Sequence, residues 1–277
     1  MEKVTRVICV LIDAANTNIF SNPEIEVPTL NALRKDGLFI HSKTVLPSDS
    51  RSARHAAFSG SYPSISGILS NNPSETVFDI AYEYGFKTII SGGWEGDAYS
   101  LDSRKIVTYT HYPKTDTISE MCSVKEMRGE YTSSYVVDRA LGFIEESPDF
   151  KILFADFLDS DCVGHRFKET SSEYRQALEY EDRQLNRLIM EFEIKGKLED
   201  SLLIVFTDHA MVNGTHGGID ALDTWIILHG NSIERGMRGK ETIGTILDIC
   251  PTICNVLNMR LPNRCRAISL IQRMKQN

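Results

Sequence analysis

The sequence predicts an α/β fold with a mostly parallel central sheet and helices on both faces. Three apolar runs rich in β-branched residues, at 6–14, 151–159 and 201–209, are typical of strands buried on both faces. A shorter run of this kind covers 224–230. Helical segments separate these runs, and strands that alternate with helices indicate a parallel sheet. Sites in such folds lie beyond the carboxyl ends of the strands.

The expected helices lie between these strands. Apolar residues recur there every three or four positions, which is the period of a helix with one buried face. The longest of them also repeats its charges at this spacing, as a solvated helix face does. These segments are 28–37, 75–85, 133–146 and 171–196.

A single domain that spans 1–277 is expected, because the sequence contains no internal repeat, low-complexity tract or evident linker. The segment at about 93–130 is the least regular and is expected to form loops or a small cap. No apolar run is long enough to span a bilayer, and the first residues make a poor signal peptide. We therefore expect a cytoplasmic protein without a membrane partner.

Charge and cysteine content narrow the partners and the compartment. A formal net charge of −8 argues against a surface for nucleic-acid polymers, although a local cation could still attract a small anionic substrate. The six cysteines contain no Cys-x-x-Cys pair, so reduced thiols are favoured over a disulfide framework. Cys250 and Cys254 lie one helical turn apart, and core packing is favoured over metal binding there.

Acidic and histidine residues follow three of the predicted strands. Each has an ordinary explanation when it is taken singly, such as a helix cap, a surface loop residue or a turn. Together they are expected to converge on one edge of the sheet, where uncompensated buried carboxylates would be costly. The residues are Asp13, Asp161, His165, Asp208, His209 and His216.

Three aspartates and three histidines form mixed oxygen and nitrogen ligand sets, which suit zinc, with manganese also possible. We expect Asp161 and His165, separated by a tight glycine-containing loop, to join His216 at one ion. Asp13, Asp208 and His209 are expected to hold a second ion that keeps one position open. Two ions this close suit displacement at phosphorus or sulfur.

The stretch "LPSDSRSARHAAFSG" at 46–60 is expected to supply that open position. If Ser50 lies at a turn between strand and helix, its hydroxyl can coordinate the second ion and act as a nucleophile. A helix that begins near Arg51 directs its positive end toward an oxyanion. The alternative is that Ser48, Ser50 or Ser52 is only a helix N-cap.

These motifs resemble the alkaline phosphatase superfamily, and most closely its branch of type I phosphodiesterases and nucleotide pyrophosphatases. "VLIDAAN" resembles the first strand–Asp motif, "SGSYP" ends a segment that resembles the nucleophile helix, and "DCVGH", "FTDHAM" and "THGG" resemble the ligand motifs. The resemblance implies an alkaline phosphatase-like fold with a small or minimal cap. It also implies a catalytic Ser50 and seven metal ligands, namely Asp13, Ser50, Asp161, His165, Asp208, His209 and His216.

Substrate-binding residues are less sharply indicated. The resemblance implies an asparagine that holds phosphate, which Asn71 or Asn72 could supply, and a tryptophan segment that contains Trp94. Arg51 and Arg54 could grip a phosphoryl oxygen as planar forks, or they could be surface ion-pair partners. The chain between Gly60 and Asp161 is short for this branch.

The resemblance implies a two-metal hydrolase of phosphoric esters, acting on a phosphodiester or a nucleotide pyrophosphate through a phosphoserine at Ser50. A phosphomonoesterase is the first alternative, because Asp49 and Ser50 form the "DS" pair of alkaline phosphatases. A phosphonate C–P hydrolase or a phosphomutase is the next. A protein that holds the metals without turnover is the non-enzymatic alternative. The expected partner is a small phosphorylated substrate.

Overall fold

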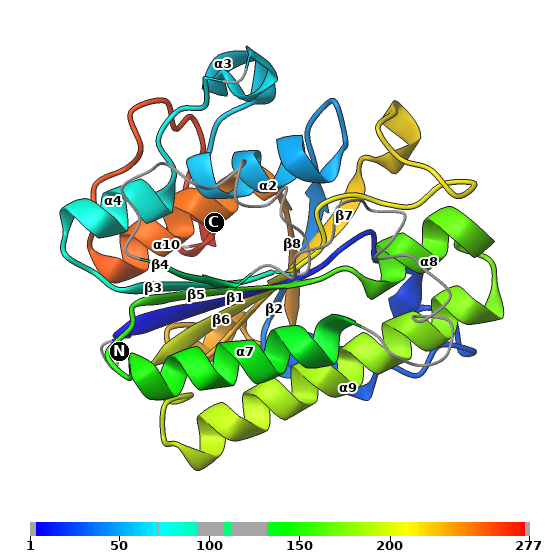
Figure 1. Cartoon of the computed structure of the whole chain (residues 1–277), viewed down its shortest axis with the longest axis horizontal. Helices are drawn as coiled ribbons and strands as arrows, with labels where there is room; N and C mark the ends of the chain where they lie inside the picture. The colour runs from blue at the N-terminus through cyan, green and yellow to red at the C-terminus, as the bar shows by residue number, and fades with distance from the viewer. Residues whose placement is uncertain (1–3, 71, 93–107, 112–131, 275–277) are drawn as a thin grey trace.

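The computed structural model describes residues 4–70, 72–92, 108–111 and 132–274, and their strands form one eight-stranded sheet in the order β4-β3-β5-β1-β6-β7-β2-β8 (Figure 1). Central strands are short apolar runs, as the sequence predicts. The strands are β1 (Arg6–Ile12), β2 (Leu38–Lys43), β3 (Thr88–Ser91), β4 (Thr108–His111), β5 (Ile152–Phe157), β6 (Ser201–Phe206), β7 (Asp223–His229) and β8 (Lys240–Thr245).

The sheet is mostly parallel, which confirms the predicted fold class. β1 lies between β5 and β6 and pairs with both in parallel, so that Cys9 faces Phe154 on one side and Ile204 on the other. β7 runs antiparallel to both of its neighbours, β6 and β2. The carboxyl ends of β5, β1 and β6 therefore meet at the same edge of the sheet.

Helices cover both faces of the sheet. In Figure 1, α2, α4 and α10 lie on one face, and α7 and α9 lie on the other. The helices are α1 (Pro28–Asp36), α2 (Ser50–Ser59), α3 (Pro63–Ser66), α4 (Val77–Glu83), α7 (Thr132–Glu146), α8 (Asp159–Phe167), α9 (Ser172–Ile194), α10 (Ile249–Leu257) and α11 (Leu270–Met274).

The core has two parts, one on each face of the sheet. All seven residues of β1 are buried. Val7, Cys9 and Leu11 join the core beneath α2, α4 and α10. The alternate residues Ile8 and Val10 join the core that α1, α7 and α9 cover. A strand with two buried faces explains why its sequence is continuously apolar rather than alternating.

Several expected boundaries differ from the observed ones. The strands predicted at 6–14, 151–159 and 201–209 end two or three residues earlier, and polar residues follow each end. Of the segment at about 93–130, only β4 lies within the described residues, and it forms an edge strand rather than a loop. No helix in the described part of the chain is long and apolar enough to cross a membrane.

Candidate active site and metal centre

The acidic and histidine residues gather at the shared edge of β5, β1 and β6. Asp13 directly follows β1, and Asp208 and His209 follow β6 by two and three residues. Asp161 lies in the first turn of α8, which begins two residues after β5. Because these strands are neighbours and parallel, they deliver all four side chains to one place.

Asp161, His165 and His216 form the first group. His165 Nε2 lies 3.4 Å from Asp161 Oδ1, and His216 Nε2 lies 3.7 Å from the same oxygen. The tight loop expected between Asp161 and His165 is wrong, because both residues belong to α8 and face the same way one turn apart. The spacing of four residues along the helix brings the two side chains together, as the loop was expected to do.

Backbone carbonyls orient both imidazoles of this group. His165 Nδ1 lies 3.0 Å from the carbonyl oxygen of Gly214, and His216 Nδ1 lies 3.2 Å from that of Ser48. A carbonyl only accepts, so the neutral rings carry their protons on Nδ1 and expose lone pairs on Nε2. The two Nε2 atoms face each other at 3.1 Å. Two opposed lone pairs beside a carboxylate favour a cation between them.

Asp13, Asp208 and His209 form the second group, and all three are at most 1% exposed. Their ligand atoms lie within 4.8 Å of one another, as do those of Asp161, His209 and His216. Asp13 Oδ1 and Asp208 Oδ2 receive no hydrogen bond from an N–H or hydroxyl group. Buried carboxylate oxygens of this kind fit a metal ion, which would compensate their charge.

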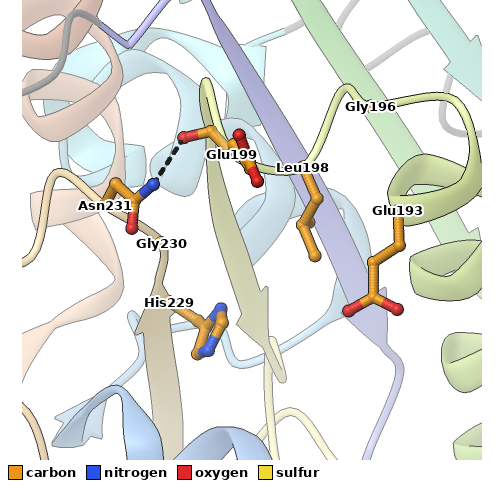
Figure 2. A pocket seen from close by; sticks show the side chains of 7 residues that line it. All are labelled: Glu193, Gly196, Leu198, Glu199, His229, Gly230 and Asn231. Carbon is orange, nitrogen blue, oxygen red and sulfur yellow. Dashed lines mark hydrogen bonds between the residues drawn. The ribbon is translucent and has the colours of Figure 1, made fainter.

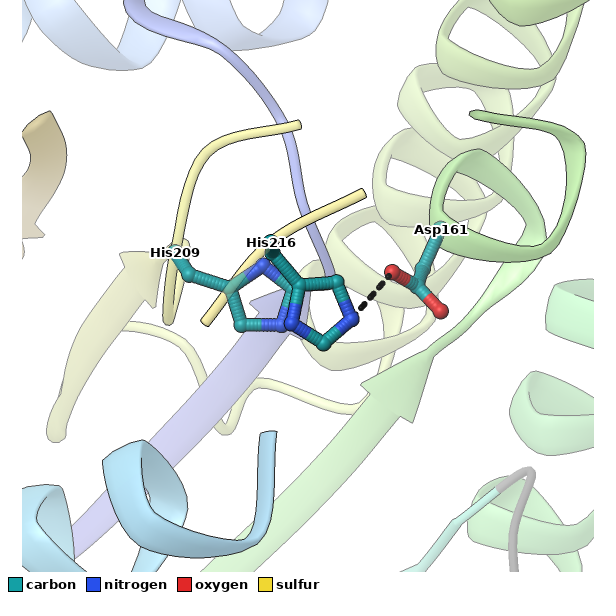
Figure 3. A group of neighbouring side chains, drawn as sticks. All are labelled: Asp161, His209 and His216. Atoms are coloured by element: carbon teal, nitrogen blue, oxygen red, sulfur yellow. Dashed lines mark ion pairs between the residues drawn. The ribbon is translucent and has the colours of Figure 1, made fainter. Parts of the chain in front are cut away.

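The two groups are continuous. The His209 ring stacks on the His216 ring with a centroid distance of 3.9 Å. Figure 3 shows both rings beside Asp161; the two histidines come from the connection that follows β6, and Asp161 comes from α8. Exposure rises across the cluster, from 0% for the His209 side chain to 16% for His216 and 36% for His165. The site therefore opens toward solvent on the side of His165.

Burial and charge shift the acidities of the second group in opposite directions. Burial raises the pKa of Asp208 well above its usual range, and the adjacent Asp13 carboxylate adds to this shift. Burial opposes ionisation of Asp13 as well, but the Arg54 guanidinium and the nearby imidazoles hold its pKa below its usual value. Burial lowers the pKa of His209 to about 3 and also lowers that of His216. Both rings are therefore neutral at pH 7, as metal ligands must be.

Ser50 lies at the first position of α2, directed at the second group. Its Oγ is 3.0 Å from His209 Nε2 and 3.4 Å from Asp13 Oδ2. The N-cap is Asp49, whose side chain accepts a hydrogen bond from Ser52 N, so none of the three candidate serines caps the helix. Since Asp49 caps α2, the Ser50 hydroxyl is directed at the acids and histidines at the positive end of the helix.

Ser48 joins the nucleophile segment to the loop that carries His216. Its hydroxyl donates to Gly218 O at 2.8 Å and accepts from Gly217 N at 3.1 Å. Its carbonyl also orients the His216 ring. Hydrogen bonds thus hold the start of α2 against the loop that carries His216.

Arg54 is buried, so the alternative of a surface ion pair is wrong, and its assignment as a substrate-binding residue stays a prediction. Its side chain is 0% exposed and pairs with the carboxylate of Asp13. Nη2 also lies 3.3 Å from Asp156 Oδ1, and Nε lies 3.7 Å from Asp208 Oδ2. Because Arg54 is four residues after Ser50 on α2, it faces the same side of the helix and lies beneath Ser50.

Asp156 was not identified from the sequence. It is fully buried within β5 and lies beside Arg54. The sequence feature that could have identified Asp156 is the carboxylate inside the apolar run "ILFADF", because a buried carboxylate needs a partner cation.

The structure says less about the other four residues that the sequence predicts to bind substrate. Arg51 is half-buried next to Ser50, and Asn72 is exposed, with its backbone N–H bound to Gly67 O at 3.1 Å. Asn71 and Trp94 lie outside the described residues. The structure therefore leaves the substrate-binding assignment of these four residues as a prediction.

Glu181 of α9 is a second buried acid that supports the site. It is 0% exposed and accepts a hydrogen bond from Ser160 N at 3.1 Å, while the Ser160 hydroxyl donates to Asp13 O at 2.6 Å. Burial raises the pKa of Glu181 well above 4.5, with a further contribution from Asp159. The folded state therefore retains a proton that the unfolded chain releases above about pH 4.5.

We expect Glu181→Gln to stabilise the metal-free protein at pH 8 and to have little effect near pH 4.5. Wild-type stability should fall by up to about 1.4 kcal/mol per pH unit as pH rises above the unfolded pKa, and the variant should lack this loss. Urea unfolding with a chelator at several pH values measures the difference. Glu173→Gln, on the exposed face of the same helix, is the control. A Gln variant that is less stable than wild type at pH 8 would contradict this protonation state.

A cavity of about 350 Å³ lies at the other end of the sheet, where β6 begins and β7 ends. Figure 2 shows Glu193, Glu199 and His229 around it. Burial lowers the pKa of His229, so this ring is neutral at pH 7. The cluster of acidic and histidine residues contributes no residue to the lining of this cavity, and we place the candidate active site at the opposite edge.

Comparison with known families shows the family of this chain. A family model described as type I phosphodiesterase / nucleotide pyrophosphatase matches residues 7–269. The chain belongs to this family. The match includes every residue of both ligand groups as well as Ser50.

Members and structural neighbours of the type I phosphodiesterase family differ widely in sequence. Venom phosphodiesterase of Macrovipera lebetinus is 23% identical over 206 residues, which are 67% of this chain and 23% of that protein. The chain therefore spans about a quarter of this curated relative.

Two solved structures show the same fold. An inactive variant of murine ectonucleotide pyrophosphatase / phosphodiesterase 5 in complex with AMP aligns with a TM-score of 0.73 over 93% of this chain and 96% of that chain, at 11% identity. The phosphonate monoester hydrolase of Silicibacter pomeroyi aligns with a TM-score of 0.70 over 96% of this chain and 76% of that chain, at 13% identity. These likenesses confirm the alkaline phosphatase-like architecture.

Proposed function

We propose that this chain hydrolyses phosphoric esters through a covalent phosphoserine at Ser50, with phosphodiesters or nucleotide pyrophosphates as the preferred class. The observation that carries the proposal is the position of the Ser50 hydroxyl, 3.0 Å from His209 Nε2 at the N-terminus of α2 and beside two groups of metal-ligand type. A serine in this setting is activated by its surroundings rather than by a separate base.

Two substitutions at phosphorus follow from this geometry. In the first, the Oγ–P bond forms while the bond from phosphorus to the leaving oxygen breaks on the opposite side, and the proton of the Ser50 hydroxyl passes to the leaving oxygen. In the second, water attacks phosphorus, the Oγ–P bond breaks and Ser50 regains its proton. The positive end of α2 favours the negative phosphoryl oxygens in both steps. Ser48 and Asp49 hold Ser50 in position throughout.

Two divalent cations, zinc or alternatively manganese, fit the donor sets. Asp161, His165 and His216 would hold one, and Asp13, Asp208, His209 and the Ser50 hydroxyl would hold the other. When bound, the ions would lower the pKa of the serine hydroxyl and compensate charge on the attacking and leaving oxygens. The neutral state of His209 and His216 at pH 7 supports this assignment.

The proposed substrate class rests on the family and on the arginine side chain next to Ser50. Membership of the type I phosphodiesterase family favours a diester or pyrophosphate. The half-buried Arg51 beside Ser50 favours an additional anionic oxygen, as in a monoester, which is the second candidate. A small phosphorylated partner and a cytoplasmic location remain our predictions.

A substrate panel tests the proposal. Zinc- or manganese-loaded protein is assayed with a nitrophenyl monoester, a bis-nitrophenyl diester, a nucleotide pyrophosphate and a phosphonate monoester. We expect the diester or pyrophosphate to give the highest kcat/KM, and we expect a chelator to remove activity by at least about 100-fold until either ion is returned.

The other outcomes are informative. A preference for the monoester would overturn the proposed substrate class but retain the Ser50 chemistry. Full activity after exhaustive chelation would contradict the use of metals. Two bound ions without turnover on all four compounds would favour a metal-holding binding protein.

A further inference from the structure

Three cysteines cluster at the far end of the nucleophile helix. Cys250 and Cys254 are fully buried, one turn apart on α10, as the sequence predicts for core residues. Cys265 follows in the segment after α10 and is half-buried. The thiols of Cys254 and Cys265 lie close enough to Cys250 to influence its acidity.

Gly60, the C-cap of α2, provides the space for this cluster. Its φ of 67° is left-handed, and a Cβ at this position would lie 2.4 Å from Cys265 Sγ and 3.4 Å from Cys250 Cβ. The two cysteine side chains therefore converge over the same glycine. The segment that carries Cys265 is hydrogen-bonded to this turn, because Arg266 N donates to Gly60 O at 2.9 Å and Ser61 Oγ donates to Arg264 O.

The surroundings make the Cys265 thiol more acidic than the Cys250 thiol. Hydrogen bonding from Cys250 and from the backbone at Ala267, together with the charge of Arg266, lowers its pKa to about 7 against the effect of burial. Burial instead raises the pKa of Cys250 well above its usual value. One partly exposed thiol with thiolate character and one buried thiol in contact with it are the elements of a peroxide-reactive pair.

We propose that Cys265 is a peroxide-reactive modification site and that Cys250 is its resolving partner. The Cys265 thiolate attacks hydrogen peroxide, the O–O bond breaks, and Cys265 sulfenic acid and hydroxide form. The Cys250 sulfur then attacks Cys265 Sγ, so that an S–S bond forms and the S–O bond breaks with release of water. The two thiols lose two electrons and two protons, and peroxide is reduced to two waters.

Among the described residues, the side chains grouped closely enough to hold an ion lie away from these thiols. Within the described residues, both groups of ligand atoms that could hold an ion belong to the catalytic cluster, and neither includes a cysteine. Ser50 is nine residues before Ser59 at the other end of α2, about 13 Å away along the axis. The modification therefore concerns the packing of the C-terminal segment rather than the reacting atoms.

Mass spectrometry of the full-length protein tests the pair. Every protein tested, the parent included, carries Cys122→Ser, because Cys122 lies outside the described residues. After treatment with one equivalent of hydrogen peroxide, we expect a peptide linked through Cys250 and Cys265 and the loss of two hydrogens from the intact mass. Without peroxide, iodoacetamide should label Cys265 at least about tenfold faster than Cys250 or Cys9.

Single substitutions separate the two roles. Cys265→Ser should abolish the reaction with peroxide and leave hydrolytic activity unchanged. Cys250→Ala, chosen because alanine fits a buried site, should accumulate Cys265 sulfenic acid that dimedone captures. Cys254→Ser is the matched control and should behave as the parent does. Three outcomes would each overturn the proposal: no oxidation of Cys265, a disulfide between Cys250 and Cys254, or undiminished peroxide consumption by Cys265→Ser. None of them depends on the proposed hydrolase function.

Discussion

Replacing Ser50 by alanine is expected to reduce phosphoric ester hydrolysis by at least about 10⁴-fold, because the variant lacks the oxygen that we propose as the nucleophile. The fold should not change, since the hydroxyl contacts side chains of the site and Asp49 still caps α2. Binding of an ion by Asp161, His165 and His216 should also persist. Steady-state kinetics and metal analysis of the purified variant measure the two effects separately.

Two further variants sharpen this result. Ser50→Thr keeps a hydroxyl at the same position and should retain measurable activity. Ser52→Ala alters a buried serine two residues further along α2 and should lower kcat by less than about tenfold. If Ser50→Ala were as active as the wild type, the nucleophile would be another group, and the proposed phosphoserine would be wrong.

Replacing Arg54 by methionine is expected to destabilise the metal-free protein by about 3–5 kcal/mol, because it leaves buried carboxylates without their paired guanidinium. Asp13 and Asp156 contact Arg54 directly, and Asp208 lies 3.7 Å from it. Added zinc should recover part of the lost stability, because an ion would compensate the charges of Asp13 and Asp208. It would not replace the guanidinium beside Asp156. Urea unfolding with chelator or with zinc measures both effects.

Asp156→Asn tests whether the pair acts as a unit. Combined with Arg54→Met, it should lessen the destabilisation by at least about 1 kcal/mol, because one unpaired buried charge is removed. Arg51→Met, on the same helix but half-buried, is the matched control and should cost less than about 1 kcal/mol. An Arg54→Met variant as stable as wild type in the absence of metal would show that the buried ion pairs carry no net stability.

The fold class and the ligand set were accessible from the sequence because both depend on local patterns. A central parallel strand must be apolar on both faces, so 6–14 and 201–209 were recognisable, and the acids and histidines at their ends stood out against that background. The polar edge strand β8 was missed because its exposed positions break the apolar pattern. α8 was missed because a nine-residue helix that contains an inward-facing ligand pair has a mixed sequence.

The sequence alone determined which side chains could do chemistry here, since the order of strands and the residues that follow them bring Asp13, Asp161 and Asp208 to one edge. Only the tertiary structure decided what each charged residue does. Arg54 is in a segment that suits either a substrate-binding or a surface arginine, and its role became clear only when β5 placed Asp156 beside it. Likewise, the carbonyls of Gly214 and Ser48 set which nitrogen of His165 and His216 faces the site. The physical reason is that pairing and proton placement depend on contacts between residues far apart in the chain, which no local pattern records.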